Sequence, residues 1–140
     1  MEMYRRAVDF ATKALQNRKS DDGRPYVEHA LRIADQMDTE EEKVVAVLHD
    51  VLEDTEMQAY DLRDAGFPES IVMMVDQMTR HNDTTYFDYI EDVATNPVTK
   101  KVKLAELQDN KDIFRVRKLS FQTFPIDVRV ERARKVLLNS

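Results

Sequence analysis

At 140 residues the chain has the length of one domain, which buries about two thirds of its unfolded surface without needing disulfides. The sequence contains no cysteine, so disulfides, thiolate metal ligands and cysteine nucleophiles are excluded, and any metal must be held by imidazole and carboxylate groups. The formal net charge is −6, and no segment concentrates Lys and Arg without acids close by, which argues against binding to a nucleic-acid polymer.

No apolar run approaches the roughly 20 residues of a membrane helix, and the first ten residues do not resemble a signal peptide. We therefore expect a cytoplasmic protein without a membrane partner. The chain has only two glycines and four prolines, while 34% of its residues are charged. That composition favours helices with a solvated face. The sequence has neither an internal repeat nor an interdomain linker, so we predict one domain over residues 1–140.

Three helices are predicted in the first part of the chain, over residues 2–16, 25–37 and 40–53. The first has an apolar face with helical spacing, formed by Tyr4, Ala7, Val8, Ala11 and Leu15. Pro25 suits the first turn of the second helix, and Thr39 with Glu42 forms a capping box that opens the third. The apolar run from Val44 to Leu48 predicts that this third helix is buried on most sides.

Five helices are predicted in the remainder of the chain, at about 58–65, 68–79, 85–94, 97–111 and 126–138. Gly66 ends the first of these, while Pro68 and Pro97 suit first turns of helices. No segment alternates convincingly with period two, so no sheet is expected. The predicted fold class is therefore all-α, with seven or eight helices.

The segment from Leu48 to Thr55 holds four side chains that can bind a metal or move a proton, namely His49, Asp50, Glu53 and Asp54. They occupy positions i, i+1, i+4 and i+5 in a segment whose neighbours are predicted as helix, so at helical spacing they point into one broad sector. An apolar helix rarely carries four ionisable groups on one side without a partner for them, and a divalent metal ion is the simplest partner. The segment therefore indicates an enzyme.

Four ligands cannot converge from a single helix, so other helices must contribute to such a site. His29, which follows Pro25 and Tyr26 in an otherwise well-patterned helix, is the natural additional imidazole. The helix over 97–111 offers three polar groups at i, i+3 and i+4 of one face, namely Glu106, Asp109 and Asn110.

Together these stretches resemble the HD-domain metal-dependent phosphohydrolases. Within that superfamily they are most similar to the small relatives of the RelA/SpoT-type alarmone hydrolases, which remove the 3′-pyrophosphate of ppGpp. The matching stretches, in order and in spacing, are Arg18-Lys19 through Gly23-Arg24-Pro25-Tyr26 to His29, Leu48 to Thr55, Met78-Thr79-Arg80, and Val102 to Asn110. The resemblance covers about residues 7–112, and it implies a single compact HD-domain helical bundle followed by the C-terminal helix over 126–138.

The resemblance implies that His29, His49 and Asp50 are three metal ligands, and that Glu106 stands where the family has an aspartate as the fourth. Glutamate is longer than aspartate by one methylene, roughly 1.3–1.5 Å of reach. Asp109, one helical turn on, is therefore an alternative ligand. The implied cofactor is one divalent ion, manganese, with iron, cobalt, zinc or magnesium as alternatives.

Glu53 and Asp54 match the acidic pair that activates or orients the attacking water in this superfamily. The chemistry of the residues agrees, because an acid beside a metal site can take a proton from water or position it. Acids at the C-terminal end of a helix also oppose the helix dipole, so they require some compensation from their surroundings.

Five further positions match residues that contact the substrate in the family. Tyr26 matches a residue near the nucleotide base, where an aromatic face can stack. Arg18 and Lys19 match a basic pair near the phosphates, in a loop about two residues longer than the common pattern. Lys103 and Asn110 match positions that line the same pocket.

We therefore expect a metal-dependent phosphohydrolase that acts on a small phosphate ester or nucleotide, with the 3′-pyrophosphate of ppGpp as one candidate. Glu106 motivates an alternative, a catalytically weakened HD domain that binds or senses a nucleotide. A third interpretation is an α-helical interaction protein with a vestigial site. At 140 residues, we expect no second, synthetase-like domain beside the predicted one.

Overall fold

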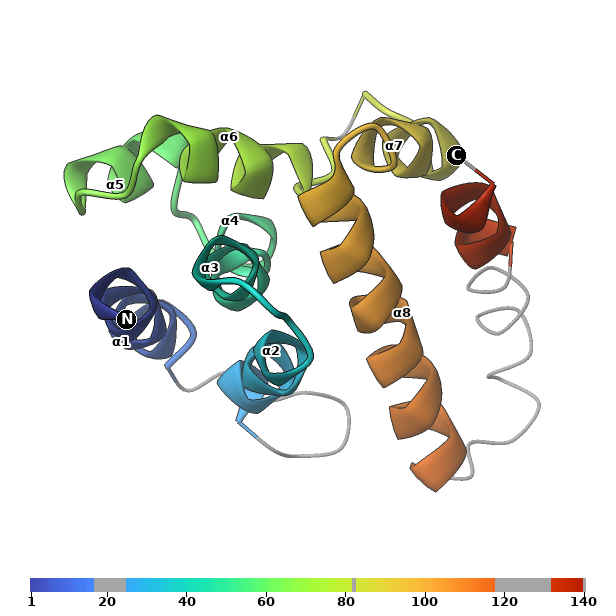
Figure 1. Cartoon of the computed structure of the whole chain (residues 1–140), viewed down its shortest axis with the longest axis horizontal. Helices are drawn as coiled ribbons and strands as arrows, with labels where there is room; N and C mark the ends of the chain where they lie inside the picture. Colours follow the sequence, from blue (N-terminus) through green and yellow to red (C-terminus); the bar gives the residue numbers. More distant parts are fainter. Residues whose placement is uncertain (17–24, 82, 118–131, 140) are drawn as a thin grey trace.

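A computed structural model of the chain describes residues 1–16, 25–81, 83–117 and 132–139, without the side chains of residues 26 and 110–117. The described residues form helices α1 to α8 and a helical segment over residues 132–138, and they contain no strand (Figure 1). The helices are α1 Glu2–Ala14, α2 Tyr26–Asp35, α3 Glu40–Leu48, α4 Val51–Asp54, α5 Ala59–Asp64, α6 Glu69–Gln77, α7 Tyr86–Val93 and α8 Pro97–Arg117. The predicted all-α fold class is confirmed.

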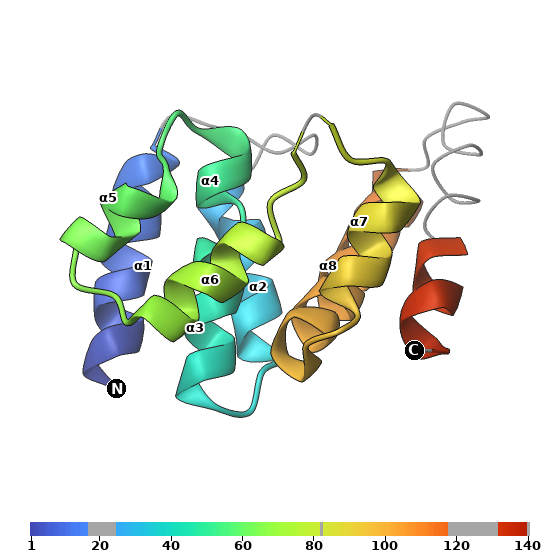
Figure 2. The same cartoon turned by 90° about the horizontal axis from the view of Figure 1, so that it is seen from above.

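Helix α3 lies at the centre of the bundle, with α1, α2, α6 and α8 packed around it (Figures 1 and 2). Each residue from Val44 to Leu48 has an exposed fraction of 0%. A continuous apolar run loses contact with water on all its faces only where neighbours cover every side, which explains the central position. The predicted burial of this helix is confirmed.

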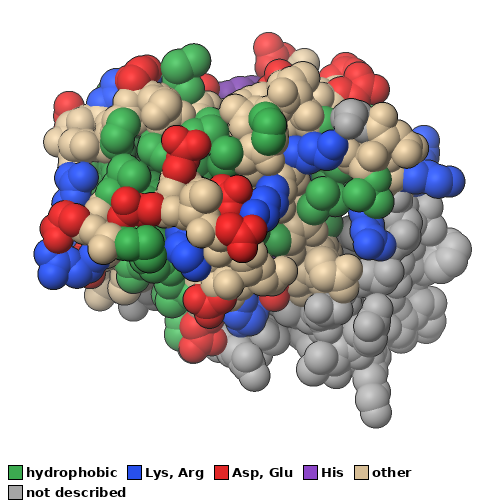
Figure 3. Space-filling view, viewed as in Figure 1, with side chains coloured by type: hydrophobic (Ala, Val, Ile, Leu, Met, Phe, Trp, Pro, Cys, Tyr) green, Lys and Arg blue, Asp and Glu red, His purple; other side chains and the backbone are tan. Residues whose placement is uncertain are grey.

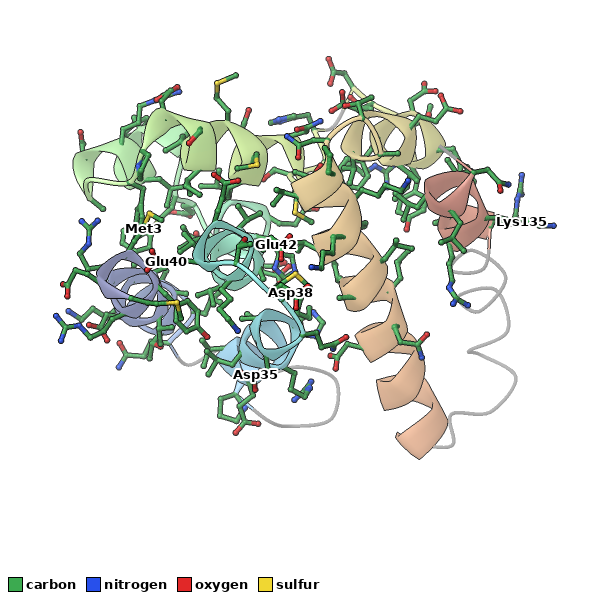
Figure 4. All side chains as sticks on the ribbon, in the orientation of Figure 1. Met3, Asp35, Asp38, Glu40, Glu42 and Lys135 are labelled. Atoms are coloured by element: carbon green, nitrogen blue, oxygen red, sulfur yellow. The ribbon has the colours of Figure 1, made fainter. Side chains whose placement is uncertain are left out.

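The start of α3 is held by polar contacts to two other helices. The side chain of Thr39 accepts from the amide of Glu42 at 3.1 Å, and Glu42 accepts from the amide of Thr39 at 3.2 Å, which completes the predicted capping box. Lys101 of α8 donates to Asp38 at 2.5 Å and to Glu42 at 2.9 Å. Glu40 accepts from the backbone amide of Tyr4 in α1 at 3.2 Å, on the side of α3 that faces α1 (Figure 4).

One boundary near the expected metal ligands differs from the prediction. The helix predicted over 40–53 ends at Leu48, and the chain turns at His49 and Asp50 before α4 begins. In a continuous helix the carbonyl of Ala46 would accept from the amide of Asp50. That carbonyl instead accepts from Nδ1 of the His49 side chain. The side-chain bond competes with the helical one, which explains why the helix is interrupted at this point.

Gly66 follows the end of α5, as predicted. Its φ of 94° lies in the left-handed region that favours glycine. The amides of Gly66 and Phe67 donate to the carbonyls of Arg63 and Leu62, which satisfies the last turn of the helix.

The C-terminal part of the chain packs as a second, smaller apolar cluster against α7 and α8. Helix α8 continues past the predicted end at residue 111. Of the helix predicted over 126–138, residues 132–138 are helical, and the rest lie outside the described residues. Ala133 and Leu137 are fully buried against apolar residues of α7 and α8.

The surface carries charges of both signs. On the face shown in Figure 3, acidic and basic side chains are interspersed, with hydrophobic side chains scattered between them. No helix in the described part of the chain is both long enough and apolar enough to cross a membrane.

A matched pair of leucines tests the core. Leu62 of α5 has an exposed fraction of 0%, whereas that of Leu138 is 58%. Leu62→Ala is expected to lower the free energy of unfolding by about 2–5 kcal/mol, because it removes apolar contact and leaves a cavity, whereas an exposed position is expected to change it by about 0.5 kcal/mol or less. Urea denaturation of the wild type, Leu62→Ala and Leu138→Ala measures both values, and equal losses would contradict the assigned core.

Candidate metal centre and adjoining cavity

Four ionisable side chains from three parts of the chain meet at one buried point. His29 lies in α2, His49 and Asp50 form the turn between α3 and α4, and Glu106 lies in α8. One donor atom each of His29, His49 and Glu106 lies within 4.8 Å of the others. Oδ2 of Asp50 is 3.2 Å from Nε2 of His49 and 3.8 Å from Nε2 of His29. Oε2 of Glu106 is 3.6 Å from Nε2 of His49. The fold thus brings together the four residues predicted as ligands.

Each imidazole is held through its Nδ1 atom, so its Nε2 atom faces the other donors. Nδ1 of His49 donates to the carbonyl of Ala46, and Nδ1 of His29 donates to Oδ2 of Asp109 at 2.5 Å. A neutral imidazole that donates through one nitrogen has a lone pair on the other. The two outer bonds therefore select the tautomer in which Nε2 is available to a cation.

Asp109 lies behind His29 and is engaged on both of its oxygens. Besides the bond from His29, Oδ1 accepts from Nε of Arg32 at 3.0 Å and Oδ2 accepts from Nη2 of Arg32 at 3.1 Å. Burial opposes ionisation of this carboxyl, but the hydrogen bonds from His29 and Arg32 outweigh it and lower the pKa of Asp109 to about 2. The geometry therefore favours Glu106 over Asp109 as the fourth donor and gives Asp109 an outer, orienting place.

The charges of the cluster are strongly interdependent. Burial raises the pKa of Asp50 well above its usual range, and the negative charge of Glu106 raises it further. Burial also opposes ionisation of Glu106, but Lys103, 3.1 Å away, and the two nearby imidazoles together outweigh this and lower the pKa of Glu106 to about 2.

The donor set fits a divalent metal ion. Within the described residues, Nε2 of His49 and Oδ2 of Asp50 are buried and have no hydrogen-bond partner. A buried polar atom without a partner costs about 1–3 kcal/mol, and a cation between these atoms would offset that cost. Imidazole nitrogen together with carboxylate oxygen is a donor combination that suits manganese, iron, cobalt or zinc.

A cavity of about 140 Å³ opens beside the donors. It is lined by His49, Asp50, Glu53, Met78, Arg80, Tyr86, Tyr89, Lys103 and Glu106. Sequence reasoning assigned no role to four of these residues. Met78 and Arg80 belong to the Met78-Thr79-Arg80 stretch that carried the family resemblance. Tyr86 and Tyr89 lie at i and i+3 of α7, a spacing that could have indicated a shared inner face.

The two predicted catalytic acids lie at different distances from this cavity. Glu53 lines it, and its Oε2 accepts from the amide of Arg80 at 2.8 Å. Asp54 is half-buried at the end of α4, and its negative charge contributes to the raised pKa of Asp50. Glu53 therefore lines the cavity, whereas Asp54 does not line it and acts on the buried donors through its charge.

Lys103 lines the cavity, where sequence reasoning placed it. Its Nζ donates to Oε2 of Glu106 at 3.1 Å and lies 5.1 Å from the ring centre of Tyr89. The Tyr89 hydroxyl in turn donates to the carbonyl of Met78 at 2.5 Å, which fixes the ring. Burial lowers the pKa of Lys103, but the charge and hydrogen bond of Glu106 together with the neighbouring tyrosines outweigh it, so the pKa is raised and the ammonium group stays protonated.

The remaining predicted substrate contacts concern parts of the chain that the structure does not describe. Arg18 and Lys19 lie outside the described residues. The backbones of Tyr26 and Asn110 belong to α2 and α8, but their side chains are not described. Their substrate roles remain predictions.

Comparison with known proteins agrees with this geometry. The family model of the HD domain matches residues 7–137, nearly the whole chain. The chain belongs to the HD-domain family. This membership, with the donor set above, supports a metal-dependent phosphohydrolase enzyme.

The HD-domain fold is also found in a solved structure described as a metazoan orthologue of SpoT that hydrolyses ppGpp and plays a role in starvation responses. The two structures superpose with a TM-score of 0.80 at 19% sequence identity, and the match covers 98% of this chain and 86% of the other. Among curated proteins, none matches the chain significantly.

Asp109 offers a direct test of how this HD domain orients its histidine. Asp109→Asn is expected to lower the affinity for Mn²⁺ about 10- to 100-fold, the usual effect of losing the outer partner of a ligating histidine. Isothermal titration calorimetry of the metal-free protein measures this affinity. Asp64→Asn, which changes an exposed aspartate of α5, is the matched control. Equal affinities in wild type and Asp109→Asn would contradict the orienting role.

Proposed function

We propose that the protein hydrolyses a phosphate or pyrophosphate group of a nucleotide-like small molecule, with the 3′-pyrophosphate of ppGpp as the first candidate. One observation carries the proposal, namely that two imidazole Nε2 atoms and two carboxylates meet beside a small cavity. The likeness in fold to a protein described as hydrolysing ppGpp supports the choice of substrate class.

In this proposal His29, His49, Asp50 and Glu106 hold one divalent ion, and manganese is the first candidate. A bound divalent ion lowers the pKa of water toward neutrality and polarises a phosphoryl oxygen. The outer bonds of the two imidazoles keep their Nε2 lone pairs directed at the ion. Glu106 is kept ionised by Lys103, so it can serve as an anionic donor.

Glu53 is the proposed acid–base residue at the cavity. One of its oxygens is fixed by the amide of Arg80, and a carboxylate held in this way can use its second oxygen to orient a water or to accept its proton. Asp54 is the second member of the acidic pair, and its negative charge contributes to the raised pKa of Asp50. Lys103 offsets negative charge beside the reacting phosphoryl group.

A second candidate function is favoured by one contact. Oε2 of Glu106 faces His49, and the same oxygen accepts from Lys103. A lysine that shares this oxygen competes with a metal ion for it. The alternative is therefore an HD domain that binds or senses a nucleotide and turns it over poorly.

Metal content and phosphate release test the first proposal. Protein purified without chelator is expected to contain about one divalent ion per chain by plasma mass spectrometry, and to release phosphate or pyrophosphate from ppGpp when Mn²⁺ is added. His49→Ala is expected to lose both properties, because it removes the central donor. A metal-free protein that is inactive on ppGpp and on other nucleotides would contradict the proposal.

Glu106→Asp separates the two candidate functions. In a working enzyme the Glu106 carboxylate already reaches the metal position. Shortening the side chain by about 1.5 Å is therefore expected to lower both the Mn²⁺ affinity and kcat. In a weakened domain the shorter carboxylate would lose its hydrogen bond from Lys103 and become available to the metal, so Mn²⁺ affinity and kcat would both rise. Metal titration and steady-state kinetics of the variant distinguish these results.

A further inference from the structure

Two cationic side chains, Lys103 and Arg80, line the cavity, and their surroundings differ. Lys103 is buried and donates to Glu106. Arg80 is exposed, at the rim of the cavity. Within the described residues, the arginines that form ion pairs are Arg5, Arg32 and Arg63, and Arg80 is not among them. Arg80 is therefore the cavity-lining cation that forms no ion pair with a described carboxylate.

The position of Arg80 is nevertheless well defined. Its amide donates to Glu53, and its Nε donates to the carbonyl of Thr84 at 3.3 Å. The guanidinium lies over the ring of Tyr86, with Cζ 5.6 Å from the ring centre. A guanidinium has five N–H donors, and stacking on an aromatic ring leaves its edge available. The terminal nitrogens make no hydrogen bond within the described residues, so they can bind an anion.

The size of the cavity determines what kind of anion reaches this edge. At about 140 Å³ the cavity is well below the 300–1,000 Å³ typical of sites that enclose a whole small molecule. It accommodates the reacting phosphoryl group, and the remainder of a nucleotide must lie outside it. The rim, where Arg80 is exposed, is the place where that remainder begins.

We propose that Arg80 is a substrate-binding residue whose terminal nitrogens bind a second phosphate group of the substrate at the rim, while Tyr86 holds the guanidinium in position. The inference rests on the proposed function for the nature of the reacting group. It adds a preference for diphosphates over monophosphates, because the second of two linked phosphates binds Arg80 and a monophosphate has no such group. Bidentate recognition of phosphate is the task to which a planar guanidinium is best suited.

The test compares binding of GDP and GMP to the manganese-loaded protein by isothermal titration calorimetry. The wild type is expected to prefer GDP by about tenfold or more, the effect of one charge-assisted contact. Arg80→Met is expected to lose this preference, and Arg80→Lys to keep part of it. Tyr86→Phe keeps the ring and is expected to behave as the wild type, whereas Tyr86→Leu is expected to lose much of the preference.

Arg63→Met is the matched control, because it removes an exposed guanidinium that is paired with Glu69 in another part of the fold. It is expected to leave the preference unchanged. The inference is overturned if the wild type shows no preference, if Arg80→Met retains it, or if Arg63→Met loses it equally.

A titration with Mn²⁺ alone separates this inference from the proposed function. Arg80→Met is expected to bind Mn²⁺ as the wild type does, because Arg80 is not one of the proposed metal ligands. Loss of Mn²⁺ binding in Arg80→Met would show that the substitution disturbs the metal site itself and would overturn the inference. Failure of the wild type to bind Mn²⁺ would count against the metal centre, and the GDP and GMP titrations without metal would still test Arg80.

Discussion

Two carboxylates and two imidazoles can be buried together inside a helical domain only if their charges and lone pairs are offset. The offsets come from outside the cluster. Lys103 supplies a positive charge to Glu106, the carbonyl of Ala46 accepts from Nδ1 of His49, and Asp109, itself held by Arg32, accepts from Nδ1 of His29. The packing of α2, α3 and α8 thus serves a polar centre as well as an apolar core. A cation placed among the donors completes this balance, so metal binding and folding are expected to be linked.

Much of the fold could be predicted because its signals are local. The apolar run from Val44 to Leu48 indicated a central helix, the Thr39 capping box indicated where it begins, and Gly66 indicated where α5 ends. The ligand set could be predicted for a different reason. The spacing of His29, the His-Asp dipeptide and Glu106 resembles that of a known family, and the fold brings these residues to one point.

Other features depend on contacts between distant segments, which a single sequence does not encode visibly. The break at His49 arises from a side chain that competes with a backbone amide, and helical periodicity gave no sign of it. The outer place of Asp109 depends on Arg32, 77 residues away along the chain. Arg80 precedes α7 and its guanidinium lies over the ring of Tyr86 in that helix, a contact that spacing alone does not indicate.

Helix α8 combines three separate tasks along one rigid rod. Lys101 contacts the start of α3, Lys103 and Glu106 face the cavity, and Asp109 supports His29. Each residue added to a helix turns everything beyond it by about 100° and advances it by about 1.5 Å. A single insertion or deletion between Lys101 and Glu106 would therefore leave the helix intact while turning the metal donor away from the register set by the attachment to α3. Among related sequences, this segment should vary in the identity of its exposed residues but not in its length.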